Sequence, residues 1–135
     1  MKASVIIERG LDGTFDANLE YNENITFGLL GQGNTVKECI EDFYNSRDEM
    51  ETYYKEEGKK FPADLEFVFK YDVASFLSYY AHAFSLAGLS RITGINQGQL
   101  SHYVTGHRKP SPKTVEKIEN SLHRFAQEIN QVKFV

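Results

Sequence analysis

The first half of the chain alternates apolar and polar positions with the two-residue period of β-strands. Residues 2–8 form a run rich in β-branched side chains, and residues 15–21 and 25–29 then alternate apolar with polar positions. Turn residues separate the runs, and Gly31 and Gly33 end the third. This pattern predicts three successive strands.

A change to helical spacing follows at once. Thr35 and Glu38 form a capping box, and apolar residues recur every three or four positions from Val36 until Gly58. The period of two returns over residues 65–71 and predicts a fourth strand. The order βββαβ favours one helix packed over an antiparallel sheet, which buries both apolar faces.

The second half of the chain has helical patterns only. Asp72 can cap a helix whose apolar stripe continues to Phe84, and Ser85 can cap a short helix that ends at Thr93. Gly94 then suits the left-handed residue that closes this helix and begins a sharp turn. We therefore predict an α+β protein with an α+β domain over residues 1–71 and an all-α domain over residues 72–135.

Asn96 can cap the helix after that turn, in which Leu100, Tyr103 and Val104 fall on one side. A loop follows, and Ser111 with Pro112 can begin a last helix. Apolar residues repeat along this helix with spacings of three and four, the pattern of a core or dimer seam: Val115, Ile118, Leu122, Phe125 and Ile129.

The outer side of the helix after Asn96 has short polar residues where a solvent-exposed helix usually has Glu and Lys. Amides and hydroxyls can bond base edges, and a glycine permits close approach of the backbone. We predict that these side chains read DNA bases: Gln97, Gly98, Gln99, Ser101 and His102. Sequence-neutral phosphate contacts are predicted for the flanking residues Asn96, Thr105, His107, Arg108 and Lys109.

Charge divides unevenly between the two halves. Residues 1–64 contain 7 Lys or Arg and 14 Asp or Glu, a net charge of −7, whereas residues 65–135 contain 8 and 5, a net charge of +3. A positive half can neutralise phosphates, and an acidic half repels them. Acidic residues of the first helix form either a solvated surface or a docking face for a basic partner. They are Glu38, Glu41, Asp42, Asp48 and Glu49.

Other functional classes have weaker support. Asp12, Asp16 and Glu20 could suggest a metal-dependent nuclease, but they fit solvated surface carboxylates better, and the four histidines lack metal-site spacing. We therefore expect no catalysis, metal or cofactor. The single Cys39 fits a small buried apolar residue. The N-terminus lacks a signal-peptide core and no run of residues could span a membrane, so we expect a cytosolic protein.

Two resemblances follow from these residues. The segment from Leu86 to Leu122, with GINQGQLSHYVTGHRKPSPKTVEKI at its centre, resembles Cro/C1-type (XRE) helix-turn-helix domains. The whole chain looks like HicB-type antitoxins, with Asp12-Gly13 before Phe15 and with Gly31, Gly33 and Thr35 leading into the first helix. That resemblance implies a partial ribonuclease H fold without catalysis and a HicA-like RNA-cleaving toxin as partner. The stretch NITFGLLGQG stands where HicB proteins commonly have a Pro-Asp-Leu-Pro-Gly-Cys-like segment.

The resemblances imply a transcriptional regulator that represses its own operon and neutralises a toxin. A standalone repressor, or a protein-binding module that has lost DNA contact, remains an alternative. A two-fold operator requires a homodimer with half-sites roughly 34 Å apart. The apolar C-terminus QVKFV adds a short strand, clasps the second subunit or frays.

Overall fold

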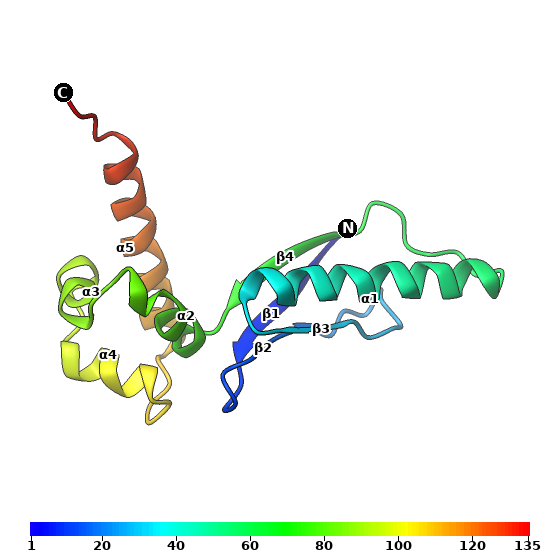
Figure 1. Ribbon diagram of the computed structural model, residues 1–135, viewed down its shortest axis with the longest axis horizontal. Coiled ribbons are helices and arrows are strands. Elements are labelled where there is room, and N and C mark those ends of the chain that lie inside the picture. The colour runs from blue at the N-terminus through cyan, green and yellow to red at the C-terminus, as the bar shows by residue number, and fades with distance from the viewer. The chain divides into compact units, whose positions relative to one another are not determined.

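The computed structural model describes all 135 residues, which form two compact units, Met1–Asp72 and Val73–Val135 (Figure 1). The first unit has the element order βββαβ and the second contains only helices, so the predicted α+β class is confirmed. The first unit consists of β1 (Lys2–Arg9), β2 (Phe15–Leu19), β3 (Leu30–Gly33), α1 (Val36–Glu56) and β4 (Glu66–Tyr71). The second consists of α2 (Val73–Tyr79), the 3₁₀ helix η1 (Tyr80–His82), α3 (Leu86–Thr93), α4 (Gln97–Val104) and α5 (Pro112–Asn130).

The four strands form one sheet in the order β3-β2-β1-β4. β1 and β2 are antiparallel, as are β2 and β3, whereas β4 runs parallel to β1 with Phe69 opposite Val5. The sheet is therefore mixed, and the prediction of an antiparallel sheet is wrong for β4. The reason is that α1 forms a crossover, which carries the chain back along the sheet before β4 begins.

One face of this sheet is covered by α1, as Figure 1 shows. Val5 and Ile7 of β1 are fully buried, and so is Phe43 of α1. The ring of Phe43 lies edge-on to Phe67 and Phe69 of β4, with centroid distances of 4.9 and 5.6 Å. These contacts join the helix to the strand that follows it in the sequence, and they form the centre of the first core.

The third strand lies later in the chain than the alternation predicts. Residues 25–29 form a loop with a bend at Phe27, and β3 begins only at Leu30. Ile25 and Leu29 are buried all the same, so their spacing reflects a loop packed against the core. The predicted strand over 25–29 is wrong, because Gly31 and Gly33, which suggest the end of a strand, lie inside β3.

Close packing against α1 explains why glycine occupies those two positions. A Cβ atom added to Gly31 would clash with the Cys39 carbonyl oxygen and lie 2.5 Å from the Phe43 nitrogen. A Cβ atom on Gly33 would lie 2.6 Å from the Cys39 nitrogen. The backbone of β3 can approach the helix this closely only without side chains, which outweighs the low strand propensity of glycine.

The predicted cap of α1 is confirmed. Thr35 Oγ1 accepts a hydrogen bond from the Glu38 N–H at 3.1 Å, and Glu38 Oε2 accepts one from the Asn34 N–H at 2.8 Å. Cys39, one turn later, is fully buried, as predicted. Burial, followed by the nearby carboxylates of Asp16 and Asp42, raises the pKa of its thiol to about 11. This thiol is therefore a packed apolar group and not a nucleophile at neutral pH.

The second half of α1 has no buried residue and is attached by an aromatic cluster. The Tyr54 ring lies edge-on to Phe27 at 5.5 Å and to Phe61 at 5.7 Å, and Phe27 stacks on Phe61 at 5.3 Å. Phe27 and Phe61 belong to the loops before β3 and before β4. These loops replace the sheet as the support for this end of the helix.

A separate core holds the second unit together. Its buried side chains come from α2, α3, α4, α5 and the turn between α3 and α4: Leu77, Leu89, Ile95, Leu100, Tyr103 and Ile118. The helix predicted to continue to Phe84 ends at Tyr79, and the chain tightens into η1, where Ala83 and Phe84 both donate backbone hydrogen bonds to the Tyr80 carbonyl. Phe84 still packs against the core. None of the helices is long and apolar enough to cross a bilayer.

The contact between β3 and α1 can be tested by adding one methyl group. We expect Gly31→Ala to lower the free energy of unfolding by about 2 kcal/mol or more, because the helix backbone must move away. Gly28→Ala is the matched control, since a Cβ atom there meets nothing within 4 Å, and its effect should stay below about 1 kcal/mol. Urea unfolding followed by circular dichroism measures both, and equal effects would contradict this explanation of β3.

Candidate nucleic-acid interface

α3 and α4 are joined by a short turn whose geometry is set by hydrogen bonds at each end. Ser85 Oγ accepts from the Gly88 N–H at 3.0 Å and caps α3. Gly94 closes α3 in the left-handed conformation, with φ 72° and ψ 11°, and its N–H donates to the Ser90 carbonyl at 2.8 Å. Both predictions, the Ser85 cap and the Gly94 closure, are confirmed.

Thr93 fixes the same turn from inside, a role that the sequence analysis does not identify. Its buried hydroxyl donates to the Leu89 carbonyl at 2.7 Å and accepts from the Ile95 N–H at 3.2 Å. The residue that follows the turn, Ile95, is itself buried in the second core. A hydroxyl residue directly before a glycine at a predicted helix end is the signal that could have revealed this bond.

α4 begins at the predicted cap and turns a polar face outward. Asn96 Oδ1 accepts from the Gly98 N–H at 2.8 Å, while Leu100 and Tyr103 are buried on the inner side. The residues predicted to read bases fall on the outer side of the helix: Gln97, Gly98, Gln99 and His102 are exposed, and Ser101 is half-buried. None of the five is buried within the chain, as a reading face requires.

The loop after α4 folds back over the last turn of that helix. Gly106 takes a left-handed conformation with φ 75°, and the Arg108 N–H donates to the His102 carbonyl at 3.2 Å. This bond brings the ring of His107 to within 4.8 Å of the His102 ring, measured between centroids. His107, Arg108 and Lys109 are exposed beside the reading face.

The other two predicted phosphate contacts have hydrogen bonds within the domain. Asn96 uses its side-chain oxygen as the cap of α4, and Thr105 Oγ1 donates to the His102 carbonyl at 3.2 Å. Both side chains are exposed. Their amide hydrogens and hydroxyl oxygen are the groups that remain for a ligand.

The electrostatic character of this surface comes from a long stretch of sequence without acidic residues. No Asp or Glu occurs from residue 73 to residue 115, a stretch that includes α2, α3, α4 and the loop to α5. The charged residues in this stretch are Arg91, Arg108, Lys109 and Lys113, all of them exposed cations. These helices and the loop after α4 therefore contribute no carboxylate that could repel a polyanion.

The first unit places the predicted acidic docking residues along α1, but not all of them are free. The Glu38 carboxylate accepts from Asn34 as described, Asp42 Oδ2 accepts from the Gln32 N–H of edge strand β3 at 2.9 Å, and Asp48 pairs with Arg47 at 2.8 Å. The Glu38 bond completes the cap of α1, and the Asp42 bond satisfies an N–H at the edge of the sheet. Glu41 and Glu49 are exposed.

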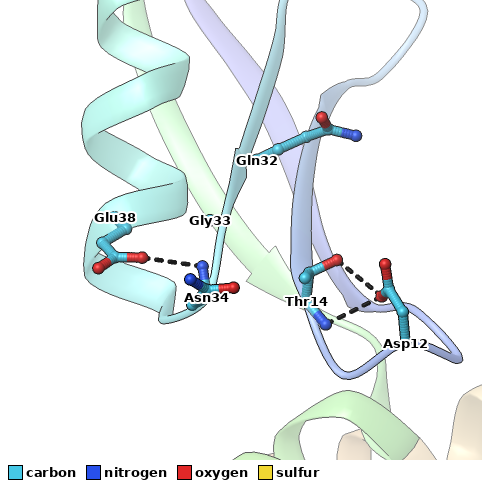
Figure 2. Close-up of a pocket in the computed structure, with 6 residues that line it drawn as sticks. All are labelled: Asp12, Thr14, Gln32, Gly33, Asn34 and Glu38. Atoms are coloured by element: carbon cyan, nitrogen blue, oxygen red, sulfur yellow. Dashed lines mark hydrogen bonds between the residues drawn. The ribbon is translucent and has the colours of Figure 1, made fainter.

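A shallow surface pocket of about 350 Å³ lies beside the start of α1 (Figure 2). Asp12, Thr14, Gln32, Gly33, Asn34 and Glu38 line it. Thr14 donates to Asp12 Oδ1 through its hydroxyl at 2.7 Å and through its N–H at 3.0 Å, and these bonds hold the pKa of Asp12 below its usual range. Figure 2 shows both carboxylates of the pocket turned to these local bonds, which shape the turns around it.

Asp12, Asp16 and Glu20, considered above as nuclease carboxylates, lie at the β1–β2 turn, on β2 and directly after β2. No group of three His, Cys, Asp or Glu side chains is placed to hold a metal ion. One oxygen of Asp16 is buried without a hydrogen-bond partner.

Comparison with known families supports the prediction that the second unit contains a helix-turn-helix domain. A helix-turn-helix family model matches residues 82–124, which include α3, the turn, α4 and most of α5. The Cro/C1-type helix-turn-helix predicted from Leu86 to Leu122 is thus confirmed. The match does not extend to the first unit, so its HicB-like character stays a prediction. No curated protein and no solved structure matches the chain.

Proposed function

We propose that this protein is a transcriptional regulator that binds DNA sequence-specifically through α4. The observation that carries the proposal is the outer face of α4, where exposed amide and imidazole side chains stand without any carboxylate on α3, on α4 or in the loop that follows. A helix of this kind fits the major groove, where Gln can bond adenine through two hydrogen bonds. The helix-turn-helix match over residues 82–124 supports the same conclusion.

The two kinds of contact have different tasks in this proposal. Gln97, Ser101 and His102 reach base edges and provide specificity, whereas Arg108 and Lys109 bind phosphates and hold α4 in register along the groove. The Arg108 N–H is hydrogen-bonded to the His102 carbonyl, so a phosphate bound by Arg108 also fixes the position of α4 on the DNA. Gly98 leaves the backbone near the start of α4 open to close approach.

Substitutions at the two kinds of contact should change binding in different ways. Arg108→Ala is expected to weaken binding to every duplex equally and to lower the slope of log K against log salt by about one. Gln97→Ala should weaken binding only to the specific duplex, at a cost of about 1–3 kcal/mol. Fluorescence anisotropy with a specific and a shuffled duplex measures both changes.

Lys60→Ala serves as the control for charge, because it removes an exposed cation from the loop before β4 in the first unit. It should leave the affinity and the salt slope unchanged. If Arg108→Ala behaved like Lys60→Ala, the phosphate contact assigned to Arg108 would be wrong.

A two-fold operator calls for a homodimer, and the exposed apolar residues near the C-terminus favour one. Ile129 is 54% exposed, Val132 51% and Phe134 94%, although all three are large apolar side chains. Ile129 and the half-buried Phe125 continue the apolar side of α5, and Val132 and Phe134 follow the end of the helix. In the proposed dimer the second subunit covers these residues and sets the spacing of two α4 helices.

Light scattering tests this assembly directly. The wild-type chain should have twice its monomer mass at micromolar concentration, and the double variant Ile129→Asp/Phe134→Asp should be a monomer, because a buried carboxylate in an apolar interface is costly. A wild-type protein that stays monomeric both free and on DNA would refute the dimer.

For the first unit we propose an antitoxin role, in which α1 binds a small basic RNA-cleaving protein and blocks its access to RNA. Support comes from the negative charge of this half and from the exposed Glu41 and Glu49 on α1. Charge complementarity of this kind speeds association and selects the partner. If no toxin exists, the protein is a standalone repressor with another role for its acidic unit.

The partner proposal is tested with the purified product of a short basic reading frame adjacent to this one. Titration calorimetry should show binding that weakens about tenfold in Glu41→Gln/Glu49→Gln, since each lost charge removes attraction across the contact. Glu119→Gln/Glu128→Gln on α5 removes the same charge from the other unit and should leave the affinity unchanged. Absence of binding, or equal losses in both variants, would overturn the antitoxin role.

A further inference from the structure

Two histidines lie together at the edge of the proposed reading face. The rings of His102, in the last turn of α4, and His107, in the loop, have centroids 4.8 Å apart and planes inclined by 34°. Both side chains are exposed. An imidazole gains or loses its proton in the physiological pH range, so this pair can change the charge of the surface at little chemical cost.

Four hydrogen bonds at the end of α4 and in the loop after it place the two rings side by side. The Thr105 N–H donates to the Ser101 carbonyl at 3.1 Å, and the Gly106 N–H donates to the Tyr103 carbonyl at 3.2 Å. The Thr105 hydroxyl and the Arg108 N–H both donate to the carbonyl of His102, each at 3.2 Å. The chain therefore reverses at Gly106, where φ is 75°, and returns His107 to the side of His102.

No carboxylate lies on α2, on α3, on α4 or in the loop that contains His107. Arg108 and Lys109 lie in the same loop, Arg91 is on α3, and Lys113 and Lys117 are on α5. The titratable side chains of α2 and η1, which precede α3, are Tyr79, Tyr80 and His82, and α4 itself has none besides His102 and Tyr103. The first carboxylate of this unit is Glu116 on α5. Neither α4 nor the loop after it therefore has a carboxylate that could pair with either ring.

Bound DNA would bring negative charge close to these two rings. Its phosphates bring a row of negative charges to the side of α4 where both rings are exposed, and a cation next to a phosphate is stabilised. A phosphate beside either ring would therefore hold a proton on that ring more tightly in the complex than in the free protein. Any group that binds protons more tightly in a complex makes that complex stronger as the pH falls.

We propose that DNA binding by this protein is coupled to proton uptake at His102 and His107, so that its operator affinity rises as the pH falls from about 8 to about 6. The inference rests on the proposed DNA-binding function and adds to it a chemical signal that sets operator occupancy. Each proton taken up also adds one cation to the surface that contacts DNA, which makes the dependence on salt steeper at low pH.

The experiment measures the affinity of the full chain for a duplex from its own upstream region near pH 6 and near pH 8, at constant ionic strength. The ratio of the two affinities is the readout, because a uniform loss of contacts cannot mimic it. We expect the wild-type protein to bind about tenfold more tightly near pH 6, His107→Gln to show a smaller ratio, and His102→Gln/His107→Gln to show a ratio near one. Glutamine keeps a polar side chain of similar size but cannot take up the proton.

His82→Gln and His123→Gln are the matched controls, because they remove exposed histidines from η1 and α5. They should keep the wild-type ratio. A second measurement on the wild-type protein alone is its salt slope, which should be larger near pH 6 than near pH 8 by one to two units.

A wild-type ratio within about twofold of one, or a double variant that keeps the wild-type ratio, would overturn the proton coupling while leaving DNA binding intact. A chain that binds no duplex at either pH would instead overturn the proposed function, and the coupling with it.

Discussion

The orientation of α4 depends on the turn that joins it to α3. Gly94 in the left-handed region reverses the chain, and the buried Thr93 hydroxyl ties the end of α3 to the N–H of Ile95. Leu100 and Tyr103 then anchor the inner side of α4 in the core. Because a helix whose inner side is fixed can present only its opposite side, these few contacts decide that amides and imidazoles face outward. Base reading needs that rigidity, since a displaced helix cannot keep two hydrogen bonds to one base.

The two halves of the chain differ in net charge, and each of the two compact units has a core of its own. In the first unit, glycines in β3 let the strand backbone lie directly on α1, and Asp42 covers an N–H at the free edge of that strand. Some acidic residues of α1 therefore stabilise the fold of the first unit. All five predicted acidic residues are exposed, but Glu38, Asp42 and Asp48 make bonds inside the unit, which narrows the proposed docking face to Glu41 and Glu49.

Local signals in the sequence were sufficient for much of this structure. Capping residues Thr35, Ser85, Asn96 and Ser111 mark four helix starts correctly, since a cap depends on bonds within one turn of the chain. The outward position of Gln97 and His102 also follows from periodicity alone. Strand β3 could not be placed this way, because its glycines are explained by the approach of a helix that begins only after the strand ends.

The other differences between the predictions from sequence and the structure also arise from contacts between residues far apart in the chain. The parallel pairing of β4 depends on where α1 returns the chain, and the bonds made by Glu38 and Asp42 depend on the neighbouring backbone of residues 32–34. The proximity of His102 and His107 depends on the reversal at Gly106, which five residues of spacing do not reveal. Pattern predicts the elements, and contacts between elements decide which side chains remain free to act.

The central claim is that the outer side of α4 distinguishes one DNA sequence from another. The most direct measurement is the affinity of the full chain, at about 150 mM salt, for a duplex from its own upstream region and for a shuffled duplex of equal composition. The account predicts a preference of about a thousandfold or more for the upstream duplex, as base readout provides. Equal affinity for the two duplexes would contradict it.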